Sequence, residues 1–188
     1  KMIILGIDPA NVGACVLVLD GVVINTWSWI ARLKRKKNAG YEIIQTILSG
    51  ESVSKTEFLV KSAGGIAEII ANGCAGVTDL HIACEDAYIG QNPRSGLSVA
   101  RMGGAIIGGV TAVIGDANVS STCLVGASSW RAAIHGFPAR AKRDVCKEQS
   151  LLLIPKIAPS IESHLGGHGM LDHITDALGV AIWRSYND

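Results

Sequence analysis

The sequence has no excess of charge of either sign and no paired-cysteine motif. Its 17 Lys and Arg residues nearly balance 16 Asp and Glu residues, which excludes a strongly basic or acidic tail. The cysteines are odd in number, and no two form a C-x-x-C pair, which argues against a zinc ribbon and a disulfide framework. Four of them lie inside apolar or mixed stretches, which indicates reduced core cysteines of an intracellular protein. They are Cys15, Cys74, Cys84, Cys123 and Cys146.

Long hydrophobic runs are also absent. The first residues are apolar for only about six positions before Asp8, too short for a signal sequence. The apolar stretch at 103–114 has 12 residues, whereas a bilayer span needs about 20. We therefore expect no membrane partner. The expected location is the cytoplasm or nucleoid, or an organellar matrix, and the chain is not expected to be secreted.

The composition is that of one globular domain. The length of 188 residues fits a single domain over residues 2–188, and 48% of the chain is hydrophobic while 18% is charged. Glycine is enriched, at 22 residues or about 12%, against a usual ~7%. This enrichment suggests tight turns and close approaches of the backbone.

Apolar runs predict three strands at the start of the chain. They cover residues 2–7, 14–19 and 22–29, and Asp20-Gly21 between the last two is a strong hairpin signal. The chain should therefore open with an antiparallel meander. Residues 31–55, which include a basic run, are expected to form a long excursion with a short helix at 41–48.

The rest of the chain predicts strands that alternate with helices. A mixed α/β sheet with helices on both faces follows from this order. We expect strands at 81–84 and 121–125, and helices at 56–72, 95–114, from 130, at 142–153 and at 170–183.

Carboxylates follow two of the buried strands. Asp8 closes the first strand and Glu85 closes the fourth. If these strands are neighbours, both side chains lie at one sheet edge, where ligands of open α/β sheets gather. In the final helix, Asp172, His173 and Asp176 share one face. The competing interpretation is ordinary: polar residues after strands, and a solvated acidic face near a helix N-terminus.

Together these features resemble the RuvC-type Holliday junction resolvases of the RNase H-like nuclease superfamily. The resemblance is carried by G-I-D-P at 6–9, the hairpin, the strand ending at Glu85, and a late helix with D-A-L-G at 176–179. The segment after Glu85 also fits, with Tyr88, Asn92 and the run at 101–104. The resemblance implies an RNase H-like five-stranded mixed sheet flanked by helices. Residues 31–55 have no clear counterpart in the family.

The resemblance implies an endonuclease that resolves four-way DNA junctions by paired symmetric nicks, acting as a homodimer. Two Mg²⁺ ions per site, with Mn²⁺ as a substitute, would support phosphodiester hydrolysis. Asp8 would bridge the two ions, and Glu85 and Asp176 would each complete one shell. His173 stands where many members carry a fourth carboxylate. Asp172 is the adjacent alternative, since the helix register is uncertain by one residue.

Ten of the 17 basic residues lie in two segments, 32–37 and 131–147. Clustering of this kind forms an electrostatic footprint, although the net charge of +1 departs from a strongly basic family profile. The resemblance implies that Tyr88 inserts at the junction centre; the alternative is that Tyr88 packs under the helix beginning near Ser95. The expected DNA-binding residues are Tyr88, Asn92, Arg94, Arg101, Arg131, Arg140, Lys142, Arg143 and Lys147.

Two other functions stay open. An actin-like or sugar-kinase-type nucleotide-binding domain also opens with a G-I-D strand and hairpin, but it usually needs two such domains. The other alternative is a catalytically inactive DNA-binding relative. The complete set of Asp8, Glu85 and Asp176 argues against it.

Overall fold

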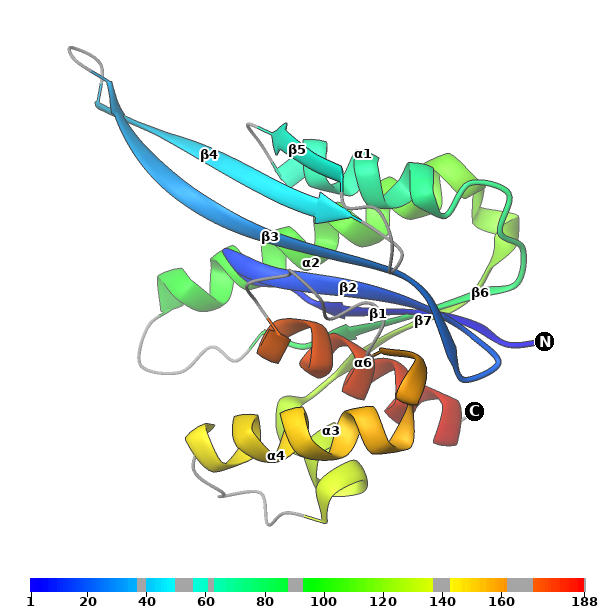
Figure 1. The fold of residues 1–188 in the computed structure, drawn as a ribbon. Helices are drawn as coiled ribbons and strands as arrows, with labels where there is room; N and C mark the ends of the chain where they lie inside the picture. The colour runs from blue at the N-terminus through cyan, green and yellow to red at the C-terminus, as the bar shows by residue number, and fades with distance from the viewer. Residues whose placement is uncertain are drawn as a thin grey trace.

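The structure, a computed structural model, describes residues 1–36, 40–49, 56–60, 63–87, 93–136, 143–161 and 171–187. One mixed sheet of seven strands, in the order β5-β4-β3-β2-β1-β6-β7, forms its middle layer. Helices cover both faces of this sheet (Figure 1).

The N-terminal meander is confirmed. β1 (Ile3–Asp8), β2 (Val12–Leu19) and β3 (Val22–Lys36) pair as consecutive antiparallel neighbours. Asp20 and Gly21 both have positive φ, at 47° and 82°. That combination is what the tight two-residue hairpin turn requires, and it explains the Asp-Gly sequence.

The parallel half of the sheet places the two strand-end carboxylates side by side. β6 (Leu80–Glu85) pairs in parallel with β1, and β7 (Val119–Val125) pairs in parallel with β6. The register joins Ile7 to Cys84, so Asp8 and Glu85 follow at the same end of adjacent strands. The two strands are therefore neighbours, which is the condition under which both carboxylates were expected at one sheet edge.

The helices divide between the two faces. The first hydrophobic cluster packs α1 (Ala63–Gly73) and α2 (Pro93–Ile114) against one face. The second packs α3, α4 and α6 against the other. These helices cover Ala127–His135, Arg143–Ile157 and Leu171–Tyr186, and short 3-10 turns η1 (Asp116–Asn118) and η2 (Pro159–Ile161) connect elements.

The region after residue 30 differs from its prediction. β3 continues to Lys36, and β4 (Gly40–Ser49) occupies the place of the predicted short helix at 41–48, which is wrong. β5 (Thr56–Val60) likewise replaces the start of the helix predicted at 56–72. A long β3 leaves an unpaired edge, and pairing along that edge satisfies backbone groups that a short isolated helix could not. The five expected strands form the core, β3-β2-β1-β6-β7, and two more extend it.

α2 confirms the helix predicted at 95–114. Within it, a 19-residue window, Gly96–Ile114, is long and apolar enough to cross a membrane by length and composition, whereas the apolar stretch considered in the sequence was the 12 residues at 103–114. In this fold Met102, Ile106, Val110 and Ile114 lie in the first hydrophobic cluster. A core helix passes the same length and composition test.

Candidate active site

Close packing at two glycines places α6 against the sheet. A Cβ on Gly6 would lie 2.2 Å from the carbonyl oxygen of Ala177, and one on Gly179 would lie 2.5 Å from the ring of Trp130. A side chain at either position would therefore push α6 away from β1 or α3. Glycine lets the first turns of α6 sit directly over the end of β1.

Asp8 and His173 meet as a consequence. His173 Nδ1 lies 2.6 Å from Asp8 Oδ2, so the ring donates to the carboxylate. Asp8 is 8% exposed and lies on the α6 side of the sheet, whereas its neighbour Ile7 lies in the opposite cluster. Of the two candidates for a fourth site residue, His173 is the one in contact with Asp8.

Glu85 and Asp176 share contacts with α3. The indole N–H of Trp130 donates to Glu85 Oε2 at 2.8 Å. A guanidinium nitrogen of Arg131 donates to Asp176 Oδ2 at 2.8 Å and lies 3.7 Å from Glu85 Oε2. The Arg131 guanidinium also stacks over the Trp130 ring, 4.6 Å from its centroid. Arg131 is thus a cation held between two carboxylates.

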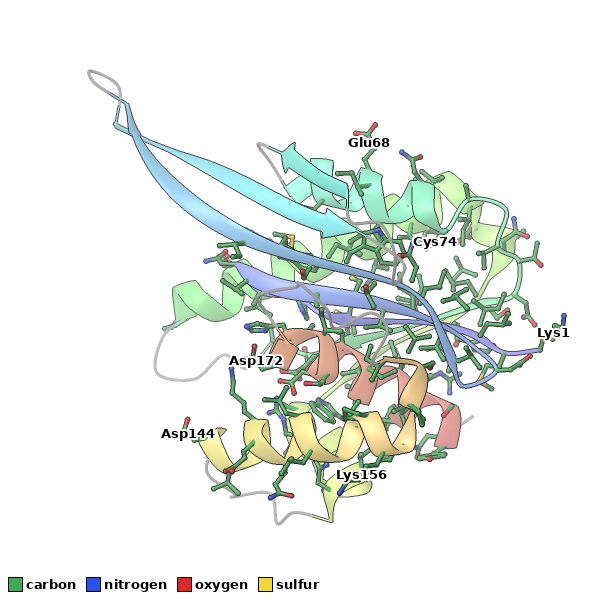
Figure 2. The ribbon with its side chains drawn as sticks, in the orientation of Figure 1. Lys1, Glu68, Cys74, Asp144, Lys156 and Asp172 are labelled. Carbon is green, nitrogen blue, oxygen red and sulfur yellow. The ribbon has the colours of Figure 1, made fainter. Side chains whose placement is uncertain are left out.

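Asp172 faces α4 instead. Its carboxylate forms an ion pair with Lys147, and its Oδ2 lies 3.9 Å from Nε2 of His173. Figure 2 labels Asp172 at the start of α6, on the side toward α4. A negative charge in the first turn of a helix is also favoured by the helix dipole. Asp172 therefore lies at the rim of the site.

Burial and mutual repulsion perturb the carboxyl groups. Burial, followed by the nearby Asp8, raises the pKa of Glu85 from 4.5 to about 7, although Arg131 and Trp130 oppose the shift. Burial also raises the pKa of Asp176 from 3.8 to about 6, despite the opposing Arg131. Burial lowers the pKa of His173, but the contact with Asp8 outweighs it, and the net shift is upward. Burial raises the pKa of Asp172, but the hydrogen bond from Lys147 outweighs burial, and the net shift of this pKa is downward.

The residues fit a divalent cation by their chemistry. Asp176 Oδ1 is buried without a hydrogen-bond partner, and the carboxylates destabilise one another's charged forms. Carboxylate oxygens of this kind are the ligands that Mg²⁺ prefers. In this conformation, no three His, Cys, Asp or Glu side chains within the described ranges are grouped closely enough to hold a metal ion. Arg131 lies between Glu85 and Asp176 instead.

The structure describes only some of the expected DNA-binding residues. Arg131 and Lys147 lie at the site, and Arg101 is exposed on α2. Arg94 and Arg143 lie in the first turns of α2 and α4. Four other expected positions fall outside the described residues: Tyr88, Asn92, Arg140 and Lys142.

The sequence analysis missed the role of Trp130 and the counter-ion role of Arg131. Trp130 is fully buried in the core, and its N–H also holds Glu85. The signal was present, because α3 begins two residues after β7 ends. Ligands of open α/β sheets gather beyond the carboxyl ends of the strands, so the residues that follow β7 are site candidates in the same way as Asp8 and Glu85.

Two solved structures share this arrangement of elements. Thermus thermophilus RuvC matches with a TM-score of 0.52 and 16% identity, covering 98% of this chain and 94% of that one. The chain has the RuvC fold. T. thermophilus RuvC in complex with Holliday junction substrate matches with a TM-score of 0.50 and 15% identity, covering 99% and 94%. Comparisons with protein-family descriptions and with curated proteins find no match. The expected RNase H-like fold class is therefore confirmed by structure.

Proposed function

We propose that this chain is a metal-dependent endonuclease that resolves four-way DNA junctions by paired symmetric nicks. The observation that carries the proposal is the convergence of Asp8, Glu85 and Asp176, with His173, at one end of a RuvC-type sheet. These groups come from β1, β6 and α6, and all lie on one face. Burying a cluster of carboxylates lowers the stability of the fold. A function that needs concentrated negative charge would explain why the cluster is present.

Asp8, Glu85, Asp176 and His173 would hold two Mg²⁺ ions, with Mn²⁺ as a substitute. When bound, the ions would activate a water molecule and stabilise the leaving oxygen of the phosphodiester. Trp130 keeps Glu85 oriented through its hydrogen bond. The products expected are a 5′-phosphate and a 3′-hydroxyl, which a ligase can seal.

Arg131 and Lys147 supply positive charge beside the acidic cluster. Phosphate groups approaching three carboxylates need such a counter-charge, and Arg suits bidentate contact with phosphate oxygens. Arg101 and the expected residues of the α4 segment would extend this contact along the DNA backbone. Phosphate contacts of this type carry most of the affinity and make it dependent on salt.

A homodimer would match the symmetry of the substrate. A four-way junction has equivalent strands that are to be cut in pairs, and each active site must face one of them. A two-fold protein dimer satisfies this requirement with two copies of the same site.

The deciding experiment compares labelled four-way junctions, Y-forks and linear duplexes in Mg²⁺ and in chelator. We expect metal-dependent cutting of the four-way junction at symmetric positions, and none by Asp8→Asn. Absence of cutting on every branched substrate with metal present would refute a nuclease. Junction binding without cutting would instead indicate an inactive relative, and saturable ATP binding would favour the actin-like alternative.

A further inference from the structure

The β3–β4 hairpin reaches beyond the rest of the sheet. β2 pairs with β3 only as far as Ile30, and β5 pairs with β4 only from Gln45 onward. Residues 31–36 therefore pair only with residues 40–45, and within this segment only Gln45 pairs with a further strand. We call this two-stranded segment the β3–β4 arm. It projects away from the body of the protein (Figure 1).

The arm leaves the sheet at the end that carries the candidate active site. Asp8, the last residue of β1, pairs with Ala14 near the start of β2, and Val12 pairs with Ile30 where the arm begins. Six residues of strand extend about 20 Å at ~3.3 Å per residue. The arm thus continues the sheet past the site by roughly the length of six base pairs of duplex, at 3.4 Å each.

Alternation along β3 assigns the arm's residues to faces. Trp27 and Trp29 lie in the α1 and α2 cluster. Strand residues alternate, so the even-numbered positions belong to the opposite face, which is the face of Asp8. Arg32, Lys34 and Lys36 occupy even positions, and Arg35 occupies an odd one.

Positive charge in this chain is concentrated on the arm. Residues 31–36 and 40–45 contain four basic residues and one acidic residue, a net charge of +3. The whole chain has +1, so everything outside the arm carries −2. A polyanion approaching the acidic site therefore meets its main attraction at the arm.

We propose that the β3–β4 arm binds the sugar-phosphate backbone of a duplex arm next to the active site, through Arg32, Lys34 and Lys36. A two-stranded ribbon is narrow enough to enter a major groove. Basic residues on a hairpin that continues beyond its neighbouring strands also discourage edge-to-edge pairing with other proteins. The proposal rests on the proposed function, because it assumes a DNA substrate.

The test measures binding to a labelled four-way junction in chelator, across a range of KCl concentrations. We expect the combined variant Arg32→Gln, Lys34→Gln and Lys36→Gln to bind at least tenfold more weakly, with the slope of log affinity against log salt reduced by about three units. Lys34→Gln should weaken binding more than Arg35→Gln, its matched control on the other face. Far-UV circular dichroism and melting temperature verify folding.

Substrate length sharpens the test. Wild-type affinity should fall when loop-capped junction arms are cut from 15 to 5 base pairs, whereas the combined variant should show no such fall. The proposal would be overturned if the combined variant kept the affinity and the salt slope of the wild type. Equal losses of affinity in Lys34→Gln and Arg35→Gln would also overturn it. A variant that changes oligomeric state in sedimentation would identify a second copy as the occupant.

The two proposals fail in different ways. If the wild-type protein cuts no branched DNA, the proposed function fails and the arm proposal falls with it. If the wild type cuts junctions and the combined variant binds and cuts them equally well, the arm proposal alone is wrong.

Discussion

The two faces of the sheet differ in kind, although the same strands build both. The α1 and α2 face is apolar and contains Cys15, Cys74 and Cys84, all buried. Burial raises the pKa of Cys74 and of Cys84 to about 12, so both thiols stay protonated and act as small apolar fillers. The α6 face carries the whole acidic cluster. Figure 2 labels Cys74 and Asp172 on opposite sides of the sheet.

Adjacent residues in one strand show the same contrast. Ile7 and Cys84 face the apolar side, while Asp8 and Glu85, one residue later, face the site. Because successive strand residues point to opposite faces, the end of one strand contributes one side chain to the apolar core and the next to the candidate site. Stability and activity should therefore be separable by substitutions one residue apart.

The largest effects should come from the pair Asp8→Asn and Ile7→Ala. Asp8→Asn removes a carboxylate from the proposed metal site and should lower junction cleavage at least ~100-fold, with binding largely retained. Ile7→Ala empties a fully buried position and should destabilise folding by ~2–5 kcal/mol, with cleavage per folded molecule kept.

Denaturant unfolding and single-turnover cleavage check this pair. If Asp8→Asn keeps full activity, the site as described is wrong. If both variants lose stability equally, the two faces are not separable.

Gly6→Ala should affect both properties together. Its Cβ would lie 2.2 Å from a carbonyl oxygen of α6, so the helix must shift away from β1. Overpacking of this kind costs ~1–3 kcal/mol, and the shift would separate His173 from Asp8. Gly21→Ala lies at an open turn with positive φ, so it strains the backbone without moving α6. We expect Gly21→Ala to lose stability but not cleavage per folded molecule.

Arg131→Gln should reduce the stability of the metal-free protein by ~1–3 kcal/mol, because two buried carboxylates lose their cation. Added Mg²⁺ or Mn²⁺ should then stabilise this variant more than it stabilises the wild type. Thermal melting with and without metal measures both effects, and Arg131→Lys is the control that keeps the charge. Equal metal stabilisation in wild type and Arg131→Gln would contradict the counter-ion role of Arg131.

The smallest effect concerns pH without metal. The raised pKa values of Glu85 and Asp176 mean that the folded protein holds protons which the unfolded chain has released. Stability should therefore fall as pH rises from about 4 to about 7, and His173, also raised, contributes in the same direction. Asp172, whose pKa is lowered, acts oppositely at acid pH.

Melting temperatures between pH 5 and 8 in chelator provide the measurement. We expect a fall of several degrees that is reduced in Glu85→Gln. A melting temperature that rises steadily over this range would contradict the repulsion within the cluster.

Much of the fold followed from local patterns. Continuous apolar runs marked β1 and β6, Asp-Gly marked the first hairpin, and the end of each strand marked Asp8 and Glu85. The errors lie in residues 40–60, where β4 pairs along β3 and β5 along β4. Each partner is the preceding strand of the chain, but such strands are stabilised by cross-strand packing, which the periodicity of the segment itself does not show.

The sequence by itself determined which residue types lie at the ends of β1, β6 and the start of α6, because chain order and alternation dictate them. Only the tertiary structure decided that His173 rather than Asp172 meets Asp8, since the close approach of α6 at Gly6 sets the rotation of that helix. It also decided that Arg131 lies between Glu85 and Asp176. Both outcomes depend on distances between segments more than 40 residues apart, which packing sets and local sequence does not.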